Sequence, residues 1–239
     1  MENFRKKFIC YNKSHYKHDD LPRKKKIFPI NKLHLLRDPI FRIDDFLKLR
    51  ENKTNKIFGN NKKIILSVGR LTKQKNFGFL IENFSKISDS FPDYVLLIIG
   101  SGEQKIELEK KIKNLKMQEK IKIMNYQKNI YRYYLNANLF VLVSLWEDPG
   151  FVIFEAAINN LTVLSSDCPN GPKEFVKNEI CGYSFKSNDH KNFRDKFIFV
   201  LKNLNSIETL KKKINAKKYS KAYTMYNHSK VFSEIFNYS

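Results

Sequence analysis

The chain has 239 residues, which is enough for one substantial α/β domain with extensions. Its 45 lysines and arginines outnumber 24 aspartates and glutamates, giving a formal net charge of +21. We therefore expect attraction to polyanions such as nucleotide diphosphates, nucleic acid and acidic lipid head groups. No apolar stretch is long enough to span a bilayer or to form a signal-peptide core, which argues against a membrane-spanning protein.

The cysteines favour a reducing compartment. Cys10, Cys168 and Cys181 are an odd, widely spaced set without metal-ligand or redox spacing. We therefore expect a cytoplasmic protein. The high positive charge leaves peripheral contact with the cytoplasmic face of an anionic membrane as an open alternative.

Residues 1–60 form a basic N-terminal segment. They contain the positively charged runs at 5–7 and 23–26 and show no series of alternating strands and helices. We expect the folded domain to occupy residues 61–205, and residues 206–239 to form a C-terminal helical extension.

The first strand expected in the main domain is the apolar run from Ile64 to Val68. The loop after it carries two cations, Arg70 and Lys75. Apolar residues at helical intervals then predict a helix over residues 76–87. Two positive side chains therefore follow the end of one buried strand.

A second strand is predicted from Tyr94 to Ile99, followed by Gly100 and Gly102 and by a charged helix over residues 103–116. Glycines at this place allow the backbone to approach a phosphate closely, and the start of a helix favours an anion. This loop is the second candidate for phosphate binding.

A short strand over 121–124 and a helix over 127–137 come next. Tyr126 lies in the loop between them. Packing of its ring against neighbouring side chains is the alternative to a role in binding.

Two glutamates flank the next strand-to-helix turn. The strand expected over 138–143 is followed by Glu147, and Gly150 helps to form a turn before a helix. Glu155 falls inside the apolar stripe of that helix, where a carboxylate needs a partner. For an isolated pair of glutamates, a structural capping role would be the alternative.

The remaining elements complete an alternating series. Strands are expected over 162–165 and 183–185, a helix opens between them at 171–174, and the pattern is helical from residue 189. The predicted fold class is α/β, a Rossmann-like parallel sheet flanked by helices.

In open sheets of this kind, ligands bind at the carboxyl ends of the strands. Neighbouring strand ends here offer cations, bare backbone amides and carboxylates. This combination fits a nucleotide diphosphate joined to a hydroxyl-rich group, which describes a nucleotide sugar.

These residues resemble the donor-binding domain of family 4 glycosyltransferases, and the predicted fold is equivalent to the C-terminal half of their two-domain GT-B architecture. The resemblance covers roughly residues 62–205, and its parts follow the order of the family. They are VGRLTKQKN, IIGSGE, ANLFVLVSLWEDPGFVIFEA, SSDCPNGPKEFV and CGYSF.

The resemblance implies a role for each candidate residue. Arg70 and Lys75 would hold the diphosphate, Glu155 would receive ribose hydroxyls and Glu147 would face the donor sugar. Backbone amides at the helix start would support sugar and phosphate, and the aromatic ring after the third strand would lie beside the base. The substrate-binding residues implied in this way are Arg70, Lys75, Gly100, Gly102, Tyr126, Glu147, Gly150, Phe151, Val152 and Glu155, and the catalytic ones are Glu147, Arg70 and Lys75.

The resemblance also implies the reaction. A hexosyl-type sugar would pass, with retained configuration, from the nucleotide sugar to a glycan or lipid-linked acceptor in cell-envelope polysaccharide or lipopolysaccharide assembly. Many relatives have Gly-Phe-Gly where this chain has Asp148-Pro149-Gly150, and Pro149 removes an amide donor. The identity of the donor is left open accordingly.

The larger departure concerns the acceptor half. Residues 1–60 are interpreted as a remnant of an acceptor domain and a linker, with only residues 32–43 resembling its last strand. A separate chain supplying an acceptor domain is therefore one expected partner. The alternative is a noncatalytic nucleotide-sugar-binding subunit or a truncated, inactive remnant.

Two other classes are less favoured by the sequence. A metal cofactor is not expected, because the chain has no Asp-x-Asp element and no His/Cys cluster with ligand spacing. Arg70 and Lys75 would neutralise the leaving diphosphate instead. The sequence does not favour a nucleic-acid-binding module, because no recognition motif accompanies the dispersed lysines.

Overall fold

The computed structural model describes residues 8–10, 33–40, 62–176 and 179–236. The chain divides into two compact units, one comprising residues 48–220 and the other residues 1–47 together with 221–239. Most of the basic N-terminal segment expected at 1–60 lies outside the described residues.

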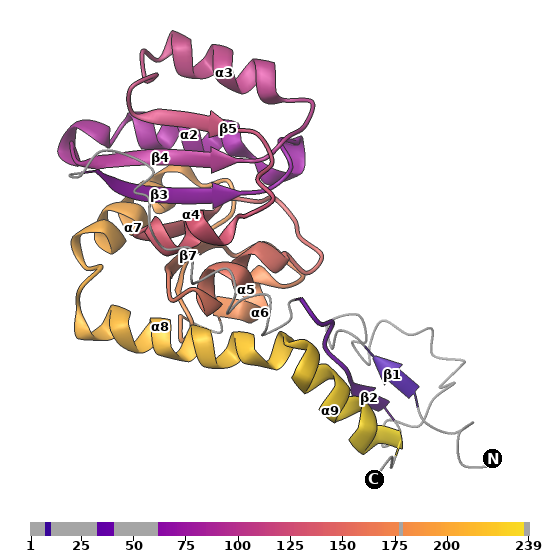
Figure 1. Ribbon diagram of the computed structural model, residues 1–239. Coiled ribbons are helices and arrows are strands. Elements are labelled where there is room, and N and C mark those ends of the chain that lie inside the picture. Colours follow the sequence, from indigo (N-terminus) through magenta and orange to yellow (C-terminus); the bar gives the residue numbers. More distant parts are fainter. Residues whose placement is uncertain (1–7, 11–32, 41–61, 177–178, 237–239) are drawn as a thin grey trace, which may run out of the picture. The chain divides into compact units, whose positions relative to one another are not determined.

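The larger unit is built on one six-stranded sheet, drawn in Figure 1. All its strands are parallel and their order is β5-β4-β3-β6-β7-β8. The strands are β3 (Lys63–Val68), β4 (Tyr94–Ile99), β5 (Ile121–Met124), β6 (Leu139–Leu142), β7 (Thr162–Ser166) and β8 (Tyr183–Phe185).

Helices alternate with these strands and cover both faces of the sheet. They are α2 (Phe77–Ser85), α3 (Lys105–Asn114), α4 (Tyr131–Asn136), α5 (Phe151–Ile158), α6 (Pro172–Val176), α7 (His190–Lys202) and α8 (Ile207–Ser220). Short 3-10 turns are η4 (Lys73–Lys75) and η5 (Ser88–Ser90). The sheet is therefore doubly wound, as the sequence predicts for a Rossmann-like domain.

Alternation along each strand divides the core into two layers. In β3, Ile65 belongs to the cluster formed with apolar side chains of α2, α3 and α7. On the opposite face, Tyr134 of α4 packs against Phe140 of β6, and α5 contacts β6 and β7. Burial on both faces explains why the central strands are continuous apolar runs.

Helix α8 belongs to the larger unit, because it packs on α5 and β7 and buries Thr209, Ala216 and Ser220. A domain boundary after residue 205 would leave these buried residues outside the sheet domain. The compact unit instead ends at Ser220.

The smaller unit contains β1 (Phe8–Cys10) paired in parallel with β2 (Leu33–Leu35), and η6 (Lys221–Tyr223) followed by α9 (Met225–Phe236). The Ile40 amide donates to the Tyr223 carbonyl oxygen over 2.8 Å. Strand β2 falls inside the expected strand-and-linker segment 32–43, whereas β1 was not expected.

Within the described part of the chain, no helix combines the length and apolar content needed to cross a membrane.

Candidate functional site

The strand order reverses between β3 and β6. From β3 the chain proceeds outward through β4 to β5, and from β6 it proceeds the other way through β7 to β8. Doubly wound sheets generally bind ligands at their carboxyl edge, beside such a switch point. The loops after β3 and β6 carry Lys75 and Glu147.

A buried ion pair joins these two loops. The Lys75 Nζ lies 2.5 Å from Glu147 Oε1, and the two side chains are 10% and 4% exposed. Ser144 Oγ donates to the same carboxylate oxygen over 2.6 Å. Ser166 Oγ in turn donates to the Ser144 carbonyl oxygen over 2.7 Å. Removing a charge pair from water is costly, and good hydrogen-bonding geometry offsets part of that cost. Here the hydrogen bonds come from residues at the ends of β6 and β7.

The backbones of the two loops are also connected. The Leu145 amide donates to the Gln74 carbonyl oxygen, and Gln74 Nε2 donates to the Trp146 carbonyl oxygen, each over 2.9 Å. The Lys75–Glu147 ion pair therefore lies between two loops that are also hydrogen-bonded to each other through their backbones.

Arg70 extends from the same loop into solvent. Among the described residues its guanidinium has no ion-pair partner. The loop thus offers one cation already neutralised by a carboxylate and one that remains available to an anion.

The glycines after β4 meet the loop after β3. A Cβ atom at Gly100 would lie 1.8 Å from the Gly69 carbonyl oxygen, and one at Gly102 would lie 2.5 Å from the Leu71 carbonyl oxygen. Contact between two protein backbones therefore requires these glycines. Their expected approach to a phosphate stays a prediction.

Glu155 projects from α5 toward α4. Tyr134 Oη donates to Glu155 Oε2 over 2.8 Å. Burial raises the pKa of Glu155 above its ordinary value, while the hydrogen bond from Tyr134 acts in the opposite direction. Burial likewise raises the pKa of Tyr134 well above its ordinary value, and the neighbouring carboxylate adds to this effect. One carboxylate oxygen is held by the tyrosine, so the other is the one suited to accept from a ligand.

Helix α5 starts beside the buried ion pair. Gly150 adopts the left-handed conformation with φ of 77°, and a Cβ there would come within 3.2 Å of the Glu147 side chain. The next residues, Phe151 and Val152, are the first of the helix. Amides at these positions have no acceptor within the helix and can bind an anion or a polar ligand.

The structure does not place Tyr126 in the alternative role of a packing residue. Its side chain is 75% exposed, so the ring is not a packing residue of the core. Its amide donates to Ser101 Oγ over 3.2 Å, which places the residue beside the loop after β4. The helix after it is shorter than the expected 127–137 and begins at Tyr131.

The sequence alone did not identify Ser144, Ser166 or Tyr134. The signal for Ser144 is its place three residues before Glu147, but the roles of Tyr134 and Ser166 depend on contacts between distant segments. The Cys168 thiol is buried, which raises its pKa to about 11, and the nearby Glu147 acts in the same direction. These surroundings favour the protonated thiol and give no support for Cys168 as a nucleophile.

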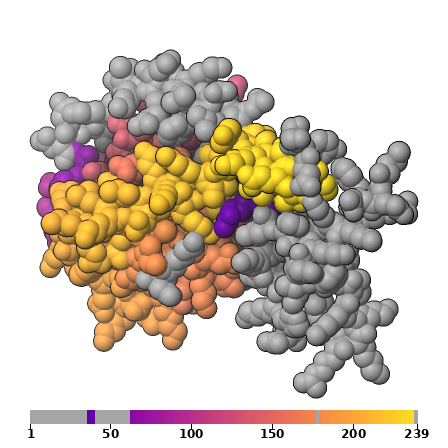
Figure 2. Space-filling view, turned by 90° about the horizontal axis from the view of Figure 1, so that it is seen from below, coloured from indigo at the N-terminus to yellow at the C-terminus, as the bar shows by residue number. Residues whose placement is uncertain are grey.

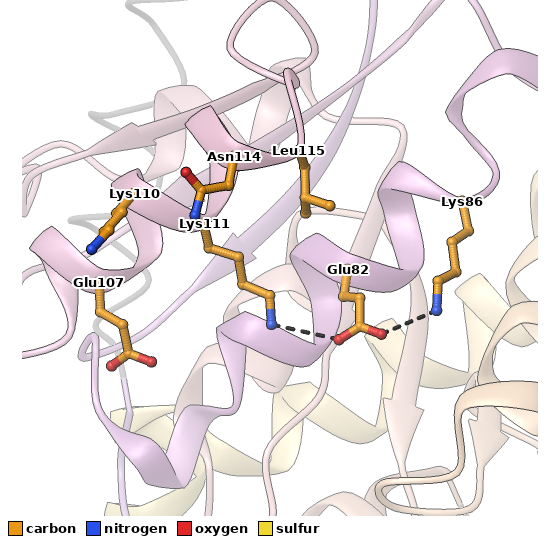
Figure 3. Close-up of a pocket in the computed structure, with 7 residues that line it drawn as sticks. All are labelled: Glu82, Lys86, Glu107, Lys110, Lys111, Asn114 and Leu115. Atoms are coloured by element: carbon orange, nitrogen blue, oxygen red, sulfur yellow. Dashed lines mark hydrogen bonds and ion pairs between the residues drawn. The ribbon is translucent and has the colours of Figure 1, made fainter.

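A shallow groove of about 500 Å³ lies between α2 and α3, and none of the residues described above lines it. Figure 3 shows its lining residues. There Glu82 bridges Lys86 and Lys111 at 3.0 and 3.5 Å. Its lining residues come from the later turns of α2 and from α3, and the charges are partly exposed. We do not assign binding to this groove, because surface ion pairs of this kind are common and weak.

Among the described residues, no group of three or more histidines, cysteines, aspartates or glutamates has an arrangement that could hold a metal ion.

Comparison with known proteins identifies the family. The family described as "Glycosyl transferases group 1" matches residues 50–221, which covers the whole sheet and the helices on both its faces. The chain belongs to the group 1 glycosyl transferases. The expected C-terminal domain of a GT-B glycosyltransferase is thereby confirmed at the level of this group.

Two curated relatives and one solved structure illustrate the similarity. The chain is 34% identical over 170 residues to an uncharacterized glycosyltransferase of Methanocaldococcus jannaschii, covering 70% of this chain and 39% of the relative. It is 33% identical to the amylovoran biosynthesis glycosyltransferase AmsD of Erwinia amylovora, covering 58% and 39%. The crystal structure of a glycosyltransferase from Rickettsia africae superposes with a TM-score of 0.77 at 20% identity, covering 98% of this chain and 64% of that one. The chain thus spans about two fifths of the length of these curated relatives.

Proposed function

We propose that this chain binds a nucleotide sugar at the switch point between β3 and β6 and acts in glycosyl transfer as a member of family 4. The observation that carries the proposal is the buried Lys75–Glu147 pair beside the exposed Arg70. It combines a positive site for a diphosphate with a fixed carboxylate for a sugar, at the edge where such sheets bind ligands.

The chemistry follows from the charges. As the bond between sugar and diphosphate breaks, negative charge grows on the leaving phosphate, and Arg70 and Lys75 stabilise it in place of a metal ion. The phosphate competes with Glu147 for the Lys75 ammonium, which leaves the Glu147 carboxylate to accept hydroxyls of the sugar. Glu155 accepts from the ribose through the oxygen that Tyr134 does not hold. Transfer of a hexosyl-type sugar with retained configuration is the family 4 reaction.

Names of other similar proteins support the substrate classes. The crystal structure of Anabaena HepE, 16% identical with a TM-score of 0.71, holds UDP and glucose. A Campylobacter jejuni relative, 32% identical over 120 residues, is named as a transferase acting on a sugar-diphospho-undecaprenol. With the amylovoran enzyme, these names favour a nucleotide-sugar donor and a glycan or lipid-linked acceptor in cell-envelope polysaccharide or lipopolysaccharide synthesis. We place this activity in the cytoplasm.

Donor binding is tested by calorimetric titration of a panel of uridine and other nucleotide sugars onto the chain in EDTA. We expect binding without metal, and we expect Arg70→Glu to weaken it by at least about tenfold, since a charged hydrogen bond is replaced by repulsion. Lys110→Glu is the matched control, because Lys110 is an exposed lysine of α3 that changes the net charge equally. Equal affinities of both variants for every donor would overturn the diphosphate site.

Transfer is tested separately with radiolabelled donor and membrane extract. Incorporation that Arg70→Glu abolishes and Lys110→Glu preserves would support the transferase. Binding without incorporation would favour the noncatalytic donor-binding alternative.

A further inference from the structure

The outer face of α8 is unusual among the described helices of the larger unit, because it combines aliphatic side chains with lysines. Ile207, Leu210 and Ile214 are 73%, 46% and 64% exposed. Their spacing of i, i+3 and i+7 puts them on one stripe of the helix. We name these three residues the α8 stripe.

The inner face of α8 packs the helix onto the rest of the unit, so the α8 stripe is not needed for that packing. Thr209, Ala216 and Ser220 are buried, and α8 packs with this side on α5 and β7. The stripe lies on the opposite side of the helix at 100° per residue. Seen from below, α8 lies at the surface of the molecule (Figure 2).

Lysines flank the stripe. Lys211 and Lys218 are exposed and fall within about 60° of Ile207 and Ile214 on the helix circumference. The acidic residue of α8, Glu208, is paired with Lys212 at a distance of 3.2 Å. The outer face therefore presents apolar and positive groups without an unpaired carboxylate among them.

This combination is not a general result of the lysine-rich composition. Helix α3 has a similar number of lysines, but its surface mixes them with the exposed acids Glu107 and Glu109 and shows one exposed aliphatic residue, Ile106. A surface such as that of α3 is solvated. The α8 surface instead has the two components that bind a helix to the boundary of an anionic bilayer.

We propose that the outer face of α8 docks on the surface of a membrane containing anionic lipids. The α8 stripe enters the boundary between head groups and acyl chains, and Lys211 and Lys218 lie against the acidic head groups. The helix lies flat on the membrane, since its inner face stays packed on the sheet. The proposal goes beyond donor binding and does not depend on it.

The test is sedimentation of the whole chain with vesicles of phosphatidylcholine alone or mixed with phosphatidylglycerol. We expect binding to the mixed vesicles and not to the neutral ones, and weaker binding at high salt. Ile207→Ser/Ile214→Ser and Lys211→Glu/Lys218→Glu should each lower the partition coefficient by at least about tenfold. Lys110→Glu/Lys113→Glu on α3 changes the net charge as much as the second variant and should have a smaller effect.

Because all the substituted side chains are exposed, the variants should fold, which circular dichroism checks. Donor titration separates this proposal from the previous one, since the α8 variants should bind nucleotide sugar normally. Failure of the chain to sediment with anionic vesicles would overturn the proposal. So would equal loss in the α3 and α8 lysine variants, or a dimer in sedimentation velocity that Ile207→Ser/Ile214→Ser dissociates, because the stripe would then be a subunit contact.

Discussion

Two clusters of paired charges, one at the carboxyl edge of the sheet and one in the groove between α2 and α3, have similar chemistry and different surroundings. Each joins one carboxylate to one or two lysines in ion pairs. The Lys75–Glu147 pair is buried and held by Ser144, whereas Glu82 shares its carboxylate between Lys86 and Lys111 at the surface. The ion pair at the switch point is buried, whereas the charges in the groove remain partly exposed to solvent.

The free energy lost when one partner of an ion pair is removed depends on how well water can solvate the charge that remains. A surface pair loses little when one partner is removed, because water solvates the remaining charge. A buried pair that loses one partner keeps an unpaired charge in the interior. A buried pair at the edge where doubly wound sheets bind ligands supports the proposal that Lys75 and Glu147 serve binding.

The largest effect is expected for Lys75→Met, which removes the charge and keeps much of the apolar stem. Glu147 would remain buried without its cation, so the free energy of unfolding should fall by about 3–5 kcal/mol. Chemical unfolding followed by circular dichroism measures it. Lys75→Met/Glu147→Leu removes both charges and should recover part of the loss. A double variant as unstable as the single one would show that the loss comes from packing.

A smaller effect is expected for Tyr134→Phe. The substitution keeps the ring against Phe140 and removes the hydrogen bond to Glu155. Since the carboxylate loses its donor, stability should fall by about 1–3 kcal/mol and the pKa of Glu155 should rise further. Unfolding at neutral pH measures the first change. Unaltered stability would show that water replaces the hydroxyl.

The next effect depends on pH and concerns Glu155→Gln. Burial raises the pKa of Glu155 in the folded state above its value in the unfolded chain. At a pH below the pKa of Glu155 in the unfolded chain, the carboxyl group is protonated in both the folded and the unfolded state. Burial of this group then costs the wild type no free energy of ionisation. As the pH rises through the folded-state pKa, the wild type loses stability that the variant does not lose. Relative to the wild type, the variant should therefore be more stable at pH 8 than at pH 4.

The same variant should bind nucleotide sugar more weakly, because a neutral amide accepts ribose hydroxyls less strongly than a carboxylate. Greater stability with weaker binding would identify Glu155 as a residue kept for its ligand. If calorimetry finds undiminished affinity in an intact fold, the ribose assignment is wrong.

The smallest effect is expected in the groove. Glu82→Gln removes the shared carboxylate between two partly exposed lysines, and we expect stability to change by less than about 1 kcal/mol. Donor affinity should not change. A loss as large as that of Lys75→Met would remove the distinction between the two clusters.

Much of the fold was predictable because its strands are short apolar runs with local limits. The strands at 94–99, 121–124 and 183–185 have the expected bounds, and the parallel architecture follows from their alternation with helices. The helix expected over 127–137 was predicted too long. Gln127 there uses its side chain to bond the Asn125 carbonyl oxygen and the Tyr133 hydroxyl in a loop before α4.

The candidate site was predictable in its residue types and not in its pairings. Strand ends place Lys75 and Glu147 on the same edge, but periodicity contains no information on which side chains meet across 72 residues. The same holds for Tyr134 and Glu155, since their contact depends on the packing of α4 beside α5. Long-range geometry is set by the whole sheet, so it has no local signal.

The close contact between the loops after β3 and β4 fixes the backbone on both sides of Arg70 before any ligand binds. The amides of Gly69 and Leu71 donate to the carbonyl oxygens of Ile99 and Ser101, and the Gln104 amide donates back to Leu71. The segment before and after Arg70 is thus anchored as an extension of the sheet. A flexible loop must lose conformational entropy when it closes on a ligand, whereas this one is ordered when the chain folds. If Arg70 binds a diphosphate as proposed, the arginine side chain would have to move on a backbone that is already held in place.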